Sequence, residues 1–310
     1  MNTMQNRDFL LLAIGLVSCH FSLGQATVGA GQAGGQPPVI APVVKTISLP
    51  AGVDIQYAEQ GAASGTPVIF LHGYTDSWYS YEQVMRHLPP SVHVFSLSQR
   101  GHGLSSRPIN GYAPADFSAD LAAFMDQLQI PSAIIAGHSM GSLIAQRFAI
   151  DHPERTKGLV LAGAIACFRN NPGLLEFCEI VKQLKDPVDS TFVLEFQKST
   201  LARELDQAEL DRYVSESRKV PARVWIEAIK GMMPADYLHE LKKADLPTLI
   251  VYGGKDVIIP MSDQEELATA IRNVKFITYP DAGHGVHWEE PERFAEDLLA
   301  FIETLNTQLK

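Results

Sequence analysis

The sequence has few cysteines and little positive charge, and each shortage excludes a class of protein. Three cysteines in 310 residues cannot build a disulfide framework, and their spacing matches no zinc module. With 25 Lys and Arg against 35 Asp and Glu, the formal net charge is −10, which argues against a nucleic-acid partner. No internal repeat is visible. What remains, 46% hydrophobic and 19% charged, is typical of a soluble globular chain of enzyme size.

Residues 1–26 have the pattern of an export signal. Arg7 precedes an apolar run of 10 residues, Phe9–Ser18, which is too short to span a bilayer but fits the central region of a signal peptide. Cleavage after Ala26 would suit a signal peptidase that reads small residues. The next segment, 27–44, is rich in Gly, Gln, Ala and Pro. It predicts a flexible tether, because it cannot bury enough apolar area to offset its ordering.

A second interpretation of the N-terminus involves Cys19. The segment Leu16-Val17-Ser18-Cys19 resembles the lipobox of bacterial lipoproteins, in which the cysteine is lipidated and becomes the new amino terminus. Both interpretations predict an exported protein, periplasmic or secreted, and the second adds a membrane anchor. The alternative to export is a buried helix or a misplaced start over residues 1–30. In an oxidising compartment Cys167 and Cys178 could pair, although two free buried thiols are favoured.

From residue 45 onwards, short apolar runs alternate with helical patterns. Helical spacing is clearest at Phe117, Leu121, Phe124 and Leu128. Most of the runs are continuously apolar, as strands covered on both faces should be. The alternation therefore predicts an α/β fold with a parallel sheet, helices on both faces and ligands at the carboxyl ends of the strands. The predicted strands lie at 47–49, 53–59, 68–71, 92–97, 133–136, 158–164, 248–252 and 275–279.

About 80 residues interrupt this alternation. Segment 166–245 has no strand-like run, and its composition is helical, with five predicted helices punctuated by Pro187, Pro221 and Pro234. An insertion at the carboxyl end of a sheet is placed to cover whatever binds there. We therefore expect 166–245 to be a helical lid, with 45–165 and 246–306 forming the core.

A glycine-flanked serine follows one of the predicted strands. The motif Gly137-His138-Ser139-Met140-Gly141 lies between the strand at 133–136 and a helical pattern at 142–152. A strand that turns sharply into a helix holds the central serine with its hydroxyl projecting, and the glycines allow close approach of the backbones. The bare motif is weak evidence, because a small-residue turn would look the same, but its context favours Ser139 as a nucleophile.

A serine hydroxyl needs a base, and that base needs a carboxylate to orient it. His284 lies in a glycine-flanked turn after the last strand, where carboxyl-end loops converge, whereas His287 is better placed for packing in the next helix. Asp256 follows the strand at 248–252. Asp263 is expected to lie within the next helix and point to solvent, so Asp256 is the predicted acid.

A tetrahedral oxyanion needs donors that are already in position. One predicted donor is the backbone N–H of Met140, which directly follows the serine. The second is the N–H of Tyr74, in the loop His72-Gly73-Tyr74 after the strand at 68–71. The alternative for this loop is a tight turn without further role.

Taken together, these motifs resemble the α/β-hydrolase family, in particular its esterases, lactonases and cofactor-free haloperoxidase-like enzymes. The likeness covers about residues 45–306 and includes Gln99–Ser105 (QRGHGLS), although Ser98 stands where many members have aspartate. It implies the eight-stranded hydrolase sheet with a helical lid. It also implies a triad of Ser139, Asp256 and His284, with an oxyanion hole made by the Tyr74 and Met140 amides.

The predicted function is therefore hydrolysis of a small-molecule ester or lactone through an acyl-enzyme, without cofactor or metal. Zinc chemistry lacks support, because the sequence has no His-Glu-x-x-His motif. A cofactor-free perhydrolase or haloperoxidase-type activity is the first alternative, since hydrogen peroxide can replace water in the same chemistry. Cleavage of an amide or C–C bond by the same triad remains open, and a binding protein without turnover is disfavoured by the intact triad.

Overall fold

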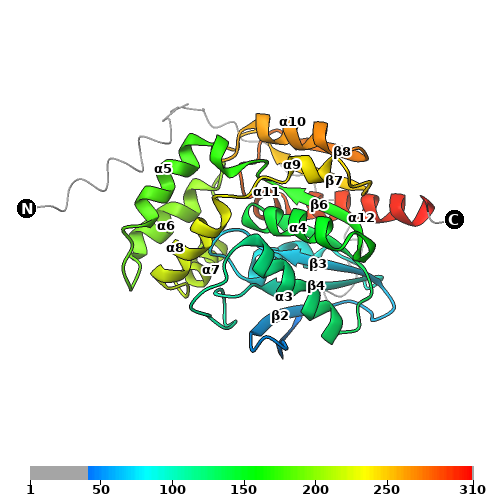
Figure 1. Cartoon of the computed structure of the whole chain (residues 1–310), viewed down its shortest axis with the longest axis horizontal. Coiled ribbons are helices and arrows are strands. Elements are labelled where there is room, and N and C mark those ends of the chain that lie inside the picture. The colour runs from blue at the N-terminus through cyan, green and yellow to red at the C-terminus, as the bar shows by residue number, and fades with distance from the viewer. Residues whose placement is uncertain (1–40, 309–310) are drawn as a thin grey trace, which may run out of the picture. The chain divides into compact units, whose positions relative to one another are not determined.

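The computed structural model describes residues 41–308 (Figure 1). The predicted signal peptide, the Cys19 alternative and most of the tether lie outside these residues. The described chain forms an α/β fold around one eight-stranded sheet, as predicted. The strands are β1 (Val43–Ser48), β2 (Asp54–Gln60), β3 (Thr66–Leu71), β4 (Val92–Ser98), β5 (Ala133–His138), β6 (Thr156–Ala162), β7 (Thr248–Gly253) and β8 (Val274–Tyr279).

The order of the strands in the sheet is β1-β2-β4-β3-β5-β6-β7-β8. Strand β2 pairs antiparallel with both β1 and β4, and the pairs from β4 to β8 are parallel. Parallel pairing brings the carboxyl ends of β3, β5, β6, β7 and β8 to one edge of the sheet. Loops that are far apart in the sequence therefore meet at that edge, where open α/β sheets bind their ligands.

Helices cover both faces because alternate residues of each central strand point to opposite sides. Ile69 and Ile135 belong to one core cluster together with apolar residues of α3 and α4, while Phe70 and Ala136 belong to a second cluster with α2 and α12. The helices of the core are η1 (Trp78–Tyr81), α2 (Glu82–Arg86), α3 (Pro114–Gln127), α4 (Met140–Asp151), η2 (Pro153–Arg155), α10 (Met261–Ala270), α11 (Val286–Glu289) and α12 (Pro291–Gln308).

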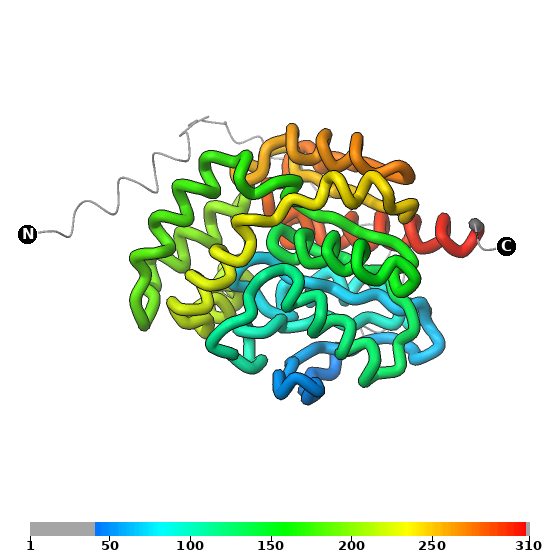
Figure 2. The backbone as a smooth tube through the Cα atoms, in the orientation of Figure 1, coloured from blue at the N-terminus to red at the C-terminus, as the bar shows by residue number. Residues whose placement is uncertain are grey.

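A helical insertion connects β6 to β7. In Figures 1 and 2 its helices α5 to α8 gather beside one end of the sheet, whereas α9 lies next to β7 and α10. Helix α8 buries Val224, Trp225, Ala228 and Ile229, which recur at helical spacing and pack into the larger core cluster. The insertion comprises η3 (Phe168–Asn170), α5 (Pro172–Val181), α6 (Ser190–Ser199), α7 (Gln207–Ser217), α8 (Ala222–Met232) and α9 (Leu238–Leu241).

A further expectation concerns the cysteines. Cys167 and Cys178 are buried and not bonded to each other, which is the favoured state. Burial raises the pKa of the Cys178 thiol to about 11, so it stays protonated at neutral pH. Within residues 41–308, none of the helices combines the length and the apolar character that crossing a bilayer requires.

Candidate active site

Ser139 occupies a strained turn between β5 and α4. Its φ is 50° and its ψ is −114°, a conformation that non-glycine residues rarely adopt. The surroundings enforce it: the Ser139 N–H donates to Ala162 O at 3.0 Å, and Ser142 donates to Ser139 O from its amide at 2.8 Å and its hydroxyl at 2.6 Å. Ser139 itself stays partly exposed, although both of its neighbours in the chain are buried.

The glycines of the motif are required by close packing. A methyl group on Gly137 would collide with the carbonyl of Gly141, and one on Gly141 would collide with the carbonyl of Leu71 at the end of β3. The turn at Ser139 is therefore pressed against the loop that follows β3. This contact brings Ser139 beside the segment that begins at His72.

His284 and Asp256 form a hydrogen-bonded pair in the loops after β8 and β7. His284 Nδ1 lies 2.8 Å from Asp256 Oδ2, and both side chains are buried. The second oxygen of Asp256, Oδ1, accepts hydrogen bonds from the backbone N–H groups of Ile258 and Ile259 at 2.8 and 2.9 Å. These two bonds hold the carboxylate in place. With Nδ1 donating to the carboxylate, Nε2 carries the lone pair and can accept a proton.

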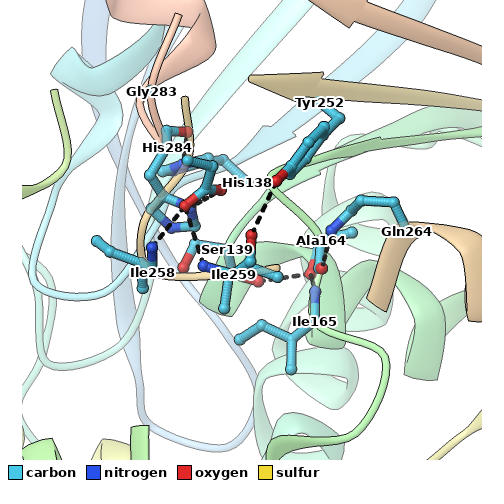
Figure 3. A network of polar contacts seen from close by, with 12 residues as sticks. His138, Ser139, Ala164, Ile165, Tyr252, Ile258, Ile259, Gln264, Gly283 and His284 are labelled. Atoms are coloured by element: carbon cyan, nitrogen blue, oxygen red, sulfur yellow. Dashed lines mark hydrogen bonds and ion pairs between the residues drawn. The ribbon is translucent and has the colours of Figure 1, made fainter. Parts of the chain in front are cut away.

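The loop after β6 joins this pair to the serine. Ala162 accepts the Ser139 amide, and the next residue, Gly163, has a φ of 48°. A methyl group on Gly163 would lie 2.9 Å from His284 Nδ1. In addition, His138 Nε2 donates to the carbonyl of His284 at 3.0 Å. Figure 3 shows Ser139 and His284 within one polar network, although in the described chain no hydrogen bond joins Ser139 Oγ to the His284 ring.

The two predicted oxyanion donors are both free. Among the described residues, neither the Tyr74 amide nor the Met140 amide donates to a protein acceptor. The Met140 amide is free because it opens α4, where the first N–H groups have no partner in the preceding turn. The arrangement thus offers a partly exposed hydroxyl, an oriented imidazole and two unpaired amides.

The α/β-hydrolase fold family matches residues 66–291. The chain belongs to this family. It is 28% identical over 271 residues to a non-heme haloperoxidase of Rhodococcus erythropolis, covering 82% of this chain and 97% of that protein. It is 24% identical over 255 residues to 3-oxoadipate enol-lactonase 2 of Acinetobacter baylyi, covering 82% and 95%. An esterase structure from Exiguobacterium antarcticum superimposes with a TM-score of 0.76 at 23% identity, covering 84% of this chain and 100% of that one.

The other histidines around the site of this α/β-hydrolase enzyme are neutral packing groups. His287 is fully buried, its Nε2 lies 2.9 Å from Ser80 Oγ, and its ring stacks on Tyr81. Burial, together with the neighbouring His284, lowers the pKa of His287 to about 3. Burial also lowers the pKa of His138 well below its ordinary value. Since neither is charged at neutral pH, neither opposes a positive charge on His284.

The expectation that Asp263 points to solvent is wrong. Asp263 lies in the first turn of α10, as the sequence indicates, but it is only 7% exposed. Its Oδ2 accepts the Ala166 amide at 3.1 Å, because α10 packs against the loop that follows β6. Burial raises the pKa of this carboxyl, and the Ala166 amide partly offsets the effect. Asp263 therefore supports the loop after β6, whereas the hydrogen bond to the His284 ring comes from Asp256.

Sequence reasoning missed another acid close to the site, Asp76. It lies two residues after Tyr74 and is 5% exposed, and Gln197 Nε2 donates to its Oδ1 at 3.1 Å. Burial raises the pKa of Asp76 to about 7, against the lowering effects of Gln197 and of the charge on His284. The sequence did offer one signal for Asp76, namely an acidic residue only three positions after Gly73 in the loop predicted to supply an oxyanion donor. Its partner could not be inferred, because Gln197 lies 121 residues away.

Proposed function

We propose that this chain is a serine hydrolase that cleaves carboxylic esters or lactones through an acyl-enzyme on Ser139. The observation that carries the proposal is the buried pair of His284 and Asp256, in loops that meet the strained turn at Ser139. A buried carboxylate aimed at Nδ1 fixes the tautomer that a general base needs. The likeness to a lactonase agrees with this reaction type.

In the proposed reaction, His284 Nε2 takes the proton of Ser139 as the serine oxygen attacks the acyl carbon. The developing oxyanion accepts hydrogen bonds from the backbone N–H groups of Tyr74 and Met140. Collapse of this intermediate breaks the bond to the alcohol oxygen, which leaves with the proton from His284. Water then attacks the acyl-enzyme by the same path, releases the acid and restores the serine. No cofactor is needed, because every proton passes through His284.

The aromatic residues that the insertion places beside Tyr74 favour a substrate with an apolar acyl group. Their position also agrees with the expectation that the insertion is a lid. Tyr74 lies edge-on to Phe196 and Phe177, with ring centroids 5.9 and 6.2 Å away, and both phenylalanines are partly exposed. Trp225 lies 5.2 Å from the same ring and is fully buried. Aromatic rings next to a proposed oxyanion donor favour substrates of small to medium size with little charge on the acyl side.

The decisive experiment combines labelling with hydrolysis. A fluorophosphonate probe should label the protein at Ser139, and Ser139→Ala should remove both the label and hydrolysis of p-nitrophenyl butyrate. We expect kcat to fall by on the order of 10⁴-fold, with unchanged circular dichroism and thermal unfolding. Most of the activity remaining in a folded Ser139→Ala protein would overturn the proposal. A panel of esters and lactones would then define the substrate.

The second candidate is perhydrolysis, which the likeness to a non-heme haloperoxidase favours. In that case hydrogen peroxide replaces water, attacks the acyl-enzyme and leaves as a peracid. Partition of one acyl-enzyme between water and peroxide separates the two activities. Peracid formation that exceeds hydrolysis at millimolar peroxide would favour this candidate.

A further inference from the structure

The loop that carries the Tyr74 amide is bonded to the helical insertion at three consecutive residues. Tyr74 Oη donates to Trp225 O, in α8, at 2.5 Å. Thr75 Oγ1 lies 3.1 Å from the hydroxyl of Ser217, in α7. Asp76 Oδ1 accepts from Gln197, in α6, at 3.1 Å. Each residue therefore contacts a different helix of a segment that lies more than 100 residues further along the chain.

These contacts form one connected network. The hydroxyl of Ser217 donates to the carbonyl of Thr75 at 3.1 Å, and Gln197 Nε2 donates to the same hydroxyl as well as to Asp76. The four side chains of this network are nearly or fully buried, with exposed fractions from 0 to 5%: Thr75, Asp76, Gln197 and Ser217. Gln197 Oε1 is buried and has no hydrogen-bond partner among the described residues, but both of the bonds that Gln197 Nε2 donates lie within the network. Buried hydrogen bonds of this kind favour one geometry, because water cannot replace a bond that breaks.

The backbone of this loop is strained. Thr75 has a φ of 66°, and a left-handed conformation is unfavourable for a β-branched residue. Such strain persists only where the surroundings over-determine the conformation. Here they include the two Ser217 contacts and the turn in which Asp76 N–H donates to Gly73 O at 3.4 Å. The bonds from Ser217 are thus part of what holds Thr75 in this conformation, and Tyr74 is the residue directly before it.

We propose that Asp76, Gln197 and Ser217 are positioning residues that hold the Tyr74 amide in place to receive the oxyanion. The insertion then does more than cover the site: its position decides whether the oxyanion hole is complete. This inference rests on the proposed function, because it assigns the Tyr74 amide to the oxyanion. It predicts that a defect in the network weakens the tetrahedral state more than it weakens binding of the ester.

The test uses the full chain with Gln197→Ala, Asp76→Ala and Asp76→Asn, assayed with p-nitrophenyl butyrate. Direct loss of an oxyanion donor costs about 10²–10³ in kcat, so a displaced donor should cost about 10–100-fold in the two alanine variants. KM should change by less than about threefold. Asp76→Asn, which can still accept from Gln197, should restore kcat to within about fivefold of the parent. An alkyl trifluoromethyl ketone, which forms a tetrahedral adduct with the serine, should lose affinity in parallel with kcat.

Gln60→Ala is the matched control. Gln60 is also buried and its Nε2 donates to a backbone carbonyl, that of Met85, at 2.7 Å, but it lies in β2 away from the network. Its kcat should stay within about twofold of the parent. If Asp76→Ala does not fold, Gln197→Ala and Ser217→Ala decide the question, because they alter only the insertion.

Unchanged kcat and unchanged ketone affinity in folded network variants would overturn the inference, as would an effect confined to KM. In either case an inactive Ser139→Ala protein would leave the proposed function standing. Activity in a folded Ser139→Ala protein would instead remove the proposed function, and the inference with it.

Discussion

The substitution Asp256→Asn tests the proposed base most sharply, because it changes one atom and keeps the fold. The new amide side chain would present its carbonyl oxygen either to the amides of Ile258 and Ile259 or to His284. The first orientation preserves two hydrogen bonds, which in the parent are 2.8 and 2.9 Å long and go to a charged acceptor. In the variant the acceptor is a neutral amide oxygen, so at about 0.5–1.5 kcal/mol each their loss would cost about 1–3 kcal/mol, and the first orientation dominates.

In that orientation the NH₂ group of the new side chain faces His284 Nδ1, where Asp256 Oδ2 now lies at 2.8 Å. The imidazole must then accept at Nδ1 and carry its hydrogen on Nε2. A ring protonated at Nε2 cannot take the proton from Ser139. The same change in a serine-protease triad lowers kcat about 10⁴-fold, equivalent to about 5.5 kcal/mol of barrier, and we expect a similar loss here.

The assay is steady-state hydrolysis of p-nitrophenyl butyrate, with urea unfolding measured on the same preparations. Because the two amide bonds remain, the free energy of unfolding should fall by no more than about 1–2 kcal/mol. Asp256→Ala is the comparison, since it loses those bonds as well and should be less stable. A folded Asp256→Asn protein with kcat within tenfold of the parent would refute the assignment of Asp256 as the orienting acid.

Four further outcomes are expected, three from the geometry of the site and one from the N-terminal sequence. His284→Ala should lower kcat nearly as far as Ser139→Ala, whereas His287→Ala should be much milder; the reverse order in ester hydrolysis would move the base to His287. Gly163→Ala should reduce kcat at least about 10²-fold, because its φ is 48° and the methyl group would lie 2.9 Å from His284 Nδ1; unchanged kinetics would contradict the tight contact. Asp76 has a folded-state pKa of about 7 against an unfolded value of 3.8, so the folded state holds the extra proton between these values. Its contribution to stability should therefore fall by about 4 kcal/mol as pH rises from 4 to 8, and urea unfolding should show a flatter pH profile for Asp76→Asn. Mass spectrometry of the mature amino terminus should find either a lipidated Cys19 or a start near Thr27, and a retained Met1 would reject export.

Local patterns predicted the strands and the longer helices of the core, such as α3 and α4, but not the short helices η1 and α2. Strand β5 and the helix after it are visible because continuous apolar runs and helical spacing are properties of neighbouring residues. The positions of Ser139, Asp256 and His284 after predicted strands follow from the same patterns. Since carboxyl ends of parallel strands share one edge of the sheet, their convergence could also be expected. The structure brings His284 and Asp256 within hydrogen-bonding distance.

What surrounds those positions could not be predicted in the same way. Asp256 and Asp263 lie seven residues apart, and nothing in the local pattern shows that α10 packs Asp263 against the amide of Ala166. The bond between Asp76 and Gln197 is equally invisible, because it joins the loop after β3 to a helix 121 residues later. In both cases burial depends on which segments pack together.

The sequence by itself determined the alternation of strands and helices, the turn at Ser139 and the residue types available for its chemistry. Only the tertiary structure decided the order of the strands in the sheet, the burial of Asp76 and Asp263, and the strained backbone of Thr75. Spacing and propensity are set by adjacent residues, so they can be read along the chain. Burial, strain and the partners of polar groups are set by long-range packing, since a side chain is desolvated only when a distant segment covers it.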